Sequence, residues 1–115
     1  MVFAHTTIHV TDLDRSIAFY SRLGMGVSRR FGPPGHEIAF LGDGDTKLEL
    51  VADGKGPVDY QCISIGFTSS EAGALAASLD EKYVGPVTPG PGVEFYFVRD
   101  PDGFTVQILD RKSVV

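Results

Sequence analysis

Polar and apolar residues alternate at the start of the chain, which predicts a half-buried strand over residues 5–10, HTTIHV. Residues 11–24, TDLDRSIAFYSRLG, then change to helical spacing. Thr11 or Asp12 is placed to cap this helix, and Gly24 is placed to end it. Three short strands are expected to follow, separated by the turn segments GPPG and GDGD, at residues 26–31, 36–41 and 46–51.

The same order of elements occurs a second time along the chain. A strand is expected over residues 62–67, CISIGF, and a helix within 68–83, where Thr68 and Glu71 have the spacing of a capping box. Three more strand candidates follow, namely GPVTPG at 85–90, VEFYFV at 93–98 and FTVQIL at 104–109. HTTIHVT aligns with CISIGFT at an offset of 57 residues, and TKLEL aligns with FTVQI at an offset of 58. The chain is therefore expected to contain two βαβββ units.

A unit of about 55 residues is only marginally stable by itself, so the two units are expected to bury one core together. The predicted fold class is α+β, with two βαβββ repeats forming a cupped mixed sheet and the helices on its outer face. The first module is assigned to residues 1–55 and the second to residues 56–115, within one domain. Short repeats leave sheet edges to be covered, which favours a homodimer.

The composition narrows the classes of partner and location. The 115 residues carry a net charge of −5 and no cluster of Lys or Arg, which argues against a nucleic-acid or anionic-membrane partner. No apolar run approaches the roughly 20 residues that span a bilayer, and no signal peptide is visible. Cys62 is the single cysteine, which fits a reducing compartment. We expect a cytoplasmic protein that takes a small-molecule ligand.

Polar side chains gather on the strand faces that point away from the predicted helices. Alternation places His5, Thr7 and His9 on this face of the first strand. The matching positions of later strands are Lys47, Glu49, Cys62, Ser64 and Gln107. If the repeats pack about a pseudo-twofold axis, four potential ligands converge on one concave surface: His5, Glu49, Cys62 and Gln107. Taken singly, each has an ordinary structural interpretation, since a lone histidine is commonly solvated and a free cysteine is commonly buried.

Two segments resemble the vicinal oxygen chelate superfamily, which includes glyoxalase I, the fosfomycin and bleomycin resistance proteins and the extradiol dioxygenases. HTTIHVTDLDRSIAFYSRLGM, residues 5–25, is similar to the N-terminal motif of glyoxalase I. FVRDPDGFTVQIL, residues 97–109, is similar to the closing hairpin and last strand of the family. Together with the repeat, the resemblance covers essentially the whole chain. It implies the paired βαβββ fold, frequently completed in a dimer.

The resemblance to glyoxalase I also implies a divalent metal, zinc or nickel, held by two residues from each repeat. The first pair of ligands maps onto His5 and Glu49, and the second pair maps onto Cys62 and Gln107, where the family has His and Glu. Glu49 and Gln107 fall on the catalytic positions, but an amide cannot accept a proton, so Glu49 is left as the base. Cys62 could ligate as a thiolate. Substrate contacts are predicted for His9, Lys47, Thr7, Ser64 and Tyr96, with His9 and Lys47 facing an anionic group.

These residues support three functions. The first is a glyoxalase I-like, metal-dependent lyase or isomerase acting on a small oxygen-chelating substrate. The second is a metal-free binding or sequestering protein of bleomycin-resistance type, favoured by the changes at Cys62 and Gln107. The third is a degenerate module that dimerises or regulates. Extradiol dioxygenation is disfavoured, because a two-His, one-carboxylate iron site finds only His5 and Glu49 at the matching positions.

Overall fold

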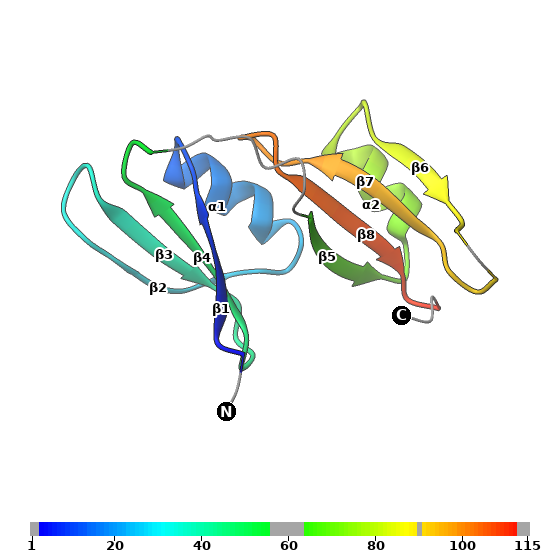
Figure 1. The fold of residues 1–115 in the computed structure, drawn as a ribbon, viewed down its shortest axis with the longest axis horizontal. Coiled ribbons are helices and arrows are strands. Elements are labelled where there is room, and N and C mark those ends of the chain that lie inside the picture. The colour runs from blue at the N-terminus through cyan, green and yellow to red at the C-terminus, as the bar shows by residue number, and fades with distance from the viewer. Residues whose placement is uncertain (1–2, 56–63, 90, 113–115) are drawn as a thin grey trace. The chain divides into compact units, whose positions relative to one another are not determined.

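The computed structural model describes residues 3–55, 64–89 and 91–112. The chain divides into two compact units, residues 1–59 and residues 60–115. Each unit has its own four-stranded sheet and its own helix (Figure 1).

The first unit follows the order strand, helix and three strands. Its elements are β1 (His5–His9), α1 (Leu13–Ser21), β2 (Val27–Phe31), β3 (Glu37–Leu41) and β4 (Lys47–Ala52). The strands lie in the order β1-β4-β3-β2. β1 runs parallel to β4, and the other two pairs are antiparallel, so the sheet is mixed. The first and last strands of the repeat are therefore neighbours in the sheet, with β1 at its edge and β4 in its interior.

α1 begins where the sequence indicates, after Asp12, but its last helical residue is Ser21, so the helix ends before the expected position at Gly24. The carboxylate of Asp12 accepts a hydrogen bond from the Arg15 amide at 3.0 Å, which satisfies one of the free N–H groups of the first turn. Gly24 has a φ of +83°, a conformation that side chains disfavour, and it leads the chain out of the helix.

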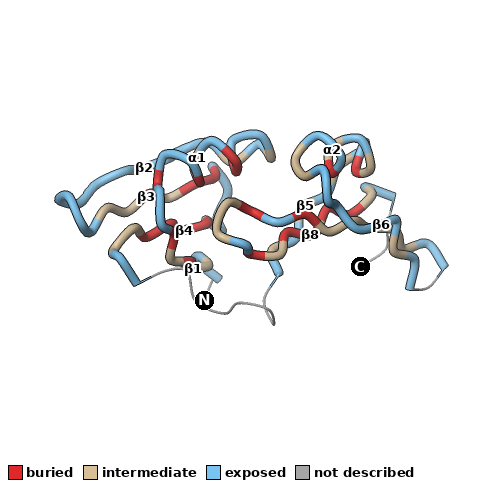
Figure 2. The backbone as a smooth tube through the Cα atoms, turned by 90° about the horizontal axis from the view of Figure 1, so that it is seen from above, coloured by how far each residue is buried: buried red, intermediate tan, exposed pale blue. Residues whose placement is uncertain are grey.

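α1 packs on one face of the first sheet, against β3 and β4 (Figures 1 and 2). Apolar side chains of the helix and of the sheet are buried between them, and they include Leu13, Phe19, Tyr20, Ala39, Leu41, Leu48 and Leu50. Because side chains alternate along a strand, this packing leaves the neighbouring positions of β1 and β4 on the open face.

The second unit repeats the arrangement. Its elements are β5 (Ser64–Ser69), α2 (Ala72–Leu79), β6 (Val84–Val87), β7 (Phe95–Arg99) and β8 (Thr105–Asp110). The strand order is β5-β8-β7-β6, with β5 parallel to β8. The buried side chains of this unit include Ala72, Ala76, Val98, Phe104, Val106 and Ile108. The α+β class and the doubled βαβββ order predicted from the sequence are thus confirmed.

The turn between β7 and β8 is organised by a buried carboxylate. Asp100 Oδ1 accepts hydrogen bonds from the amides of Asp102, at 2.9 Å, and Phe104, at 2.8 Å. Gly103 has a φ of +90°, which favours glycine at this position of the turn. The DPDG segment therefore fixes the hairpin that brings β8 back against β7.

Two local predictions need correction. The capping box predicted at Thr68 and Glu71 is wrong, because β5 extends to Ser69 and Thr68 lies within it. The Glu71 amide instead donates to Ser69 Oγ at 3.1 Å, and no side chain caps α2. The helix is consequently confined to 72–79 within the expected 68–83.

Three other predictions are not tested by these elements. The first two residues of the strand expected at 62–67 lie outside the described residues. The homodimer and the module limits at 55 and 56 remain predictions. In the part of the chain that the structure describes, no helix is long and apolar enough to cross a membrane.

Candidate functional site

The open face of the first sheet carries the polar residues predicted for it. In the parallel pair of β1 and β4, His5 lies beside Lys47, Thr7 beside Glu49, and His9 beside Val51. Residues paired in this way share a face of the sheet. Five of the predicted site residues, from two strands separated by some forty positions in the sequence, are therefore neighbours on one surface.

Glu49 is the centre of this group. His5 Nε2 lies 3.6 Å from Glu49 Oε1, and Thr7 Oγ1 donates a hydrogen bond to the same oxygen at 2.5 Å. The side chain of His5 is 41% exposed, whereas that of Glu49 is 16% exposed. The carboxylate is thus partly withdrawn from solvent while the imidazole remains accessible to a ligand.

The separation of the two donors fits a divalent cation. Zinc lies about 2.0–2.2 Å from nitrogen and oxygen ligands, so two ligands of a tetrahedral ion are about 3.4 Å apart. The 3.6 Å between His5 Nε2 and Glu49 Oε1 is close to that value. Among the described residues no group of three or more His, Cys, Asp and Glu side chains is gathered for a metal, so this pair supplies two ligands and not a full set.

Aromatic rings continue the surface beyond His5. The Phe40 ring meets the His5 ring edge-on with centroids 5.5 Å apart, and Phe31 stacks on Phe40 at 6.2 Å. The guanidinium carbon of Arg29 lies 4.6 Å from the Phe31 ring centre. Phe40, Phe31 and Arg29 were not among the site residues predicted from the sequence. Register could have revealed Phe40, because it pairs with Glu49 and so shares its face.

Lys47, predicted to contact an anionic group, is held by a local bond. Its ammonium nitrogen donates to the carbonyl oxygen of Gly44 in the preceding turn. Lys47 of β4 remains beside His5 of β1, at one end of the row of polar residues formed by His5, Thr7, His9, Lys47 and Glu49.

His9 is paired with the carboxylate of Asp53, which was not predicted from the sequence. His9 Nδ1 lies 3.0 Å from Asp53 Oδ1, and the Lys55 amide donates to the same oxygen at 3.1 Å. The side chain of Asp53 is 5% exposed and that of His9 is 35% exposed. The hydrogen bond from His9 lowers the pKa of the Asp53 carboxyl below its usual value, with the Lys55 amide adding to the effect.

The second sheet places Gln107 on its own open face. Gln107 pairs with Gly66 of β5 and with Phe97 of β7, and Ser64 lies two residues before Gly66 on the same face. A Cβ at Gly66 would lie 3.5 Å from Gln107 Oε1, an ordinary contact distance, so the two positions adjoin on this face. Cys62, the remaining predicted ligand, lies outside the described residues.

The pairing register of the two repeats differs from the sequence alignment. Thr7 pairs with Glu49, and Gly66, rather than Ser64, pairs with Gln107. The offset of 57 aligns Thr7 with Ser64, whereas the strand pairing makes Gly66 the counterpart of Thr7. The first strand of the second repeat is therefore displaced by two residues relative to the sequence alignment. Judged by strand pairing, the counterpart of His5, which lies beside Lys47, is Ser64, which lies beside Thr105.

Tyr96 lies on the opposite face of the second sheet from Gln107. It pairs with the buried Ile108, and a Cβ at Gly73 of α2 would come within 2.9 Å of its hydroxyl oxygen. Its partial burial raises the pKa of the Tyr96 phenol. This placement gives no support to the substrate contact predicted for Tyr96.

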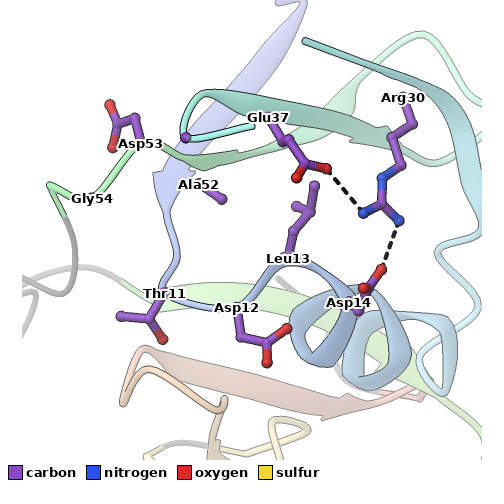
Figure 3. Close-up of a pocket in the computed structure, with 10 residues that line it drawn as sticks. Thr11, Asp12, Leu13, Asp14, Arg30, Glu37, Ala52, Asp53 and Gly54 are labelled. Carbon is purple, nitrogen blue, oxygen red and sulfur yellow. Dashed lines mark hydrogen bonds and ion pairs between the residues drawn. The ribbon is translucent and has the colours of Figure 1, made fainter. Parts of the chain in front are cut away.

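A separate pocket of about 450 Å³ opens at the N-terminal end of α1 (Figure 3). Its carboxylates are engaged within the protein: Asp14 and Glu37 both bond Arg30, at 2.7 and 3.2 Å, and Asp12 caps the helix. The hydrogen bonds with Asp14 and Glu37 raise the pKa of the Arg30 guanidinium, and the bond with Asp14 has the largest effect. The pocket wall thus fastens β2 and β3 to the helix. Asp53 stands at its rim with the carboxylate turned away from Arg30 and Glu37 (Figure 3).

Paired βαβββ repeats with a His and a Glu on the open face of the first sheet are the architecture of a vicinal oxygen chelate protein. The chain belongs to the Glyoxalase/Bleomycin resistance protein/Dioxygenase superfamily, whose family model matches residues 2–108. This confirms the resemblance found in the sequence.

Individual relatives are similar over nearly the full chain. A lactoylglutathione lyase of Haemophilus influenzae is 35% identical, over 98% of this chain and 95% of the relative. A trypanothione-dependent glyoxalase I of Leishmania major matches with a TM-score of 0.76 and 32% identity, over 97% of this chain and 88% of the other. An antibiotic binding protein from Streptomyces matches with a TM-score of 0.74 and 18% identity, over 96% of this chain and 95% of the other, and shows the fold alone.

Proposed function

We propose that this protein is a metal-dependent lyase or isomerase of glyoxalase I type. The observation that carries the proposal is the contact of His5 Nε2 with Glu49 Oε1, 3.6 Å apart on an open sheet face. The proposal is further supported by the relatives named lactoylglutathione lyase, among them those of H. influenzae and, as a probable enzyme, of Vibrio cholerae at 32% identity.

The substrate class follows from the chemistry in that name. Lactoylglutathione is a thioester of a 2-hydroxy acid, and its cleavage to glutathione leaves a three-carbon 2-oxoaldehyde by atom balance. The interconversion moves a proton between two adjacent carbons that both carry oxygen. We propose that this chain acts on such a thiol adduct, with glutathione or a related thiol as the carrier.

His5 and Glu49 would hold zinc or nickel through a nitrogen and an oxygen atom, as their separation allows. When bound, such a metal polarises substrate oxygens and stabilises negative charge that develops on them. Thr7 orients the Glu49 carboxylate through its hydrogen bond. Contributions of Cys62 and Gln107 to the same metal remain predictions from the resemblance.

A metal-free binding function is the second candidate. It is favoured by the rings of Phe31, Phe40 and His5, which offer an apolar surface next to the polar row. A planar ligand could stack on this surface without any reaction.

Enzyme assays with defined metal content separate the two functions. The full chain is stripped of metal with a chelator, supplied with zinc or nickel, and assayed for lactoylglutathione formation from glutathione and the three-carbon 2-oxoaldehyde. We expect activity to disappear on chelation and to return with metal, and we expect Glu49→Gln to stay inactive. Glu81→Gln, which changes an exposed carboxylate in the turn after α2, is the matched control and should behave like the wild type. Metal-independent ligand binding without turnover would favour the second candidate.

A further inference from the structure

The open face of the first sheet carries a second pair of titratable residues, His9 and Asp53. His9 Nδ1 and Asp53 Oδ1 are 3.0 Å apart. His9 follows Thr7 by two residues on the same face of β1, so the two backbones are about 6.6 Å apart along the strand. A substrate held at Glu49, the partner of Thr7, would therefore lie within reach of the His9 imidazole.

The hydrogen bonds of Asp53 determine which ring nitrogen of His9 carries the proton. Asp53 Oδ1 accepts from the Lys55 amide as well as from His9, and both bonds favour the ionised carboxylate. An ionised carboxylate can only accept hydrogen bonds, so the proton of the contact belongs to Nδ1 of His9. In the neutral imidazole the lone pair then resides on Nε2. The 35% exposed ring offers this nitrogen to a ligand, while the 5% exposed Asp53 holds the ring in place.

The proposed reaction requires a base, and the residues at the two predicted catalytic positions are poorly suited to that role. Gln107 carries an amide, which cannot accept the proton. Glu49 is contacted at Oε1 by both Thr7 and His5, and as a metal ligand its charge would be further engaged. His9 has neither constraint.

On the basis of the proposed function, we propose that His9 is the proton-transfer residue of this site and that Asp53 is its positioning residue. Nε2 takes the proton from the carbon that bears sulfur and hydroxyl. The electron pair of that C–H bond forms a carbon–carbon double bond, and the carbonyl π pair moves onto its oxygen. Nε2 then returns the proton to the adjacent carbon as the electrons move back to form the thioester carbonyl. The hydroxyl proton of the sulfur-bearing carbon passes to the neighbouring oxyanion, which becomes the hydroxyl group of the product. The imidazole ends neutral, and no further reactant is consumed.

The test compares His9→Asn with the wild type, using the metal-loaded full chain. Asparagine can still donate to Asp53 from its amide but lacks a basic nitrogen, so it preserves the contact and removes the base. We expect kcat to fall by about 10²–10⁴-fold, the range typical of general acid–base catalysis, with metal content and unfolding temperature unchanged. His36→Asn changes an exposed histidine in the loop before β3 and should leave kcat unchanged.

Asp53→Asn tests the positioning role with a spectroscopic readout. Imidazole ¹⁵N shifts in the wild type should show the Nδ1–H form of neutral His9, and this signature should be lost or mixed in Asp53→Asn together with a lower kcat. An unchanged ring signature and kcat would show that Asp53 does not position His9.

The outcomes distinguish this assignment from the function on which it rests. A fall in kcat with unchanged KM in His9→Asn supports proton transfer. A rise in KM with unchanged kcat would overturn the assignment and leave His9 as a binding residue. Active wild type together with a fully active His9→Asn would overturn the assignment alone, whereas an inactive metal-loaded wild type would overturn both.

Discussion

At the scale of single residues, both close contacts of Glu49 converge on the same oxygen, Oε1, which Thr7 and His5 approach from β1. A carboxylate oriented in this way presents its remaining oxygen and lone pairs to a ligand in a fixed direction. Thr7 thereby becomes part of any metal site at this position without being a ligand.

Thr7→Val tests this orienting bond, since valine keeps the shape and removes the hydroxyl. We expect the affinity for zinc or nickel to fall by about 10–100-fold, as is usual when a hydrogen-bond partner of a ligand is lost. Calorimetric titration measures it. Thr46→Val, which removes a hydroxyl bonded to the Phe3 carbonyl in a turn, is the control. Equal affinities in the wild type and Thr7→Val would contradict the orienting role.

The pKa of Asp53 gives a pH-dependent prediction. Its bond with His9 lowers the pKa of the folded carboxyl below 3.8, so the ionised form is favoured by folding. The resulting stability is fully present above the unfolded value near 3.8 and is lost as the pH falls through the lowered folded value. Asp53→Asn should therefore be less stable than the wild type at pH 7, and the difference should shrink under strongly acidic conditions. Urea unfolding at several pH values measures both, and a difference independent of pH would contradict the account.

Alternation along a strand was sufficient to predict that His5, Thr7 and Glu49 share a face, because two-residue periodicity follows from strand geometry. It could not predict Asp53. That residue follows the end of β4, and the position of its side chain depends on the turn that also brings the Lys55 amide to it. Tyr96 shows a related limit, since its face became known only from its register with Ile108.

At the scale of elements, strand and helix order followed from periodicity, whereas one boundary and one register did not. β5 continues through Thr68 because its pairing with β8 reaches Ser69, and these inter-strand bonds outweigh a local capping signal. The two-residue displacement of β5 relative to the alignment has the same origin. Pairing with a strand some forty residues away decides it, and the local sequence does not contain that information.

The β7–β8 hairpin gives the clearest prediction for an element. Asp100→Ala removes the acceptor of the Asp102 and Phe104 amides and leaves buried donors without it. We expect the free energy of unfolding to fall by about 1–3 kcal/mol, the usual cost of an unsatisfied buried polar group. Chemical denaturation measures the change. Asp43→Ala, in an exposed turn before β4, should have little effect, and an equal loss in both variants would argue against the specific role of Asp100.

At the scale of the whole molecule, the family assignment and the doubled unit rest on independent observations, the match over residues 2–108 and the two mixed sheets. The sequence predicted a homodimer from the need to cover sheet edges. β2 has exposed residues throughout and carries the half-exposed apolar side chains of Val27 and Phe31. We therefore expect light scattering at micromolar concentration to give the mass of a dimer, and a monomer mass would contradict the prediction.

The proposed function depends above all on the open face of the first sheet binding a divalent metal through His5 and Glu49. Calorimetric titration of the chelator-treated full chain with zinc and with nickel tests it most directly, with Glu49→Gln and Glu81→Gln measured alongside. We expect stoichiometric binding in the wild type and in Glu81→Gln, and loss of binding in Glu49→Gln. Absence of binding in the wild type, or undiminished binding in Glu49→Gln, would contradict it.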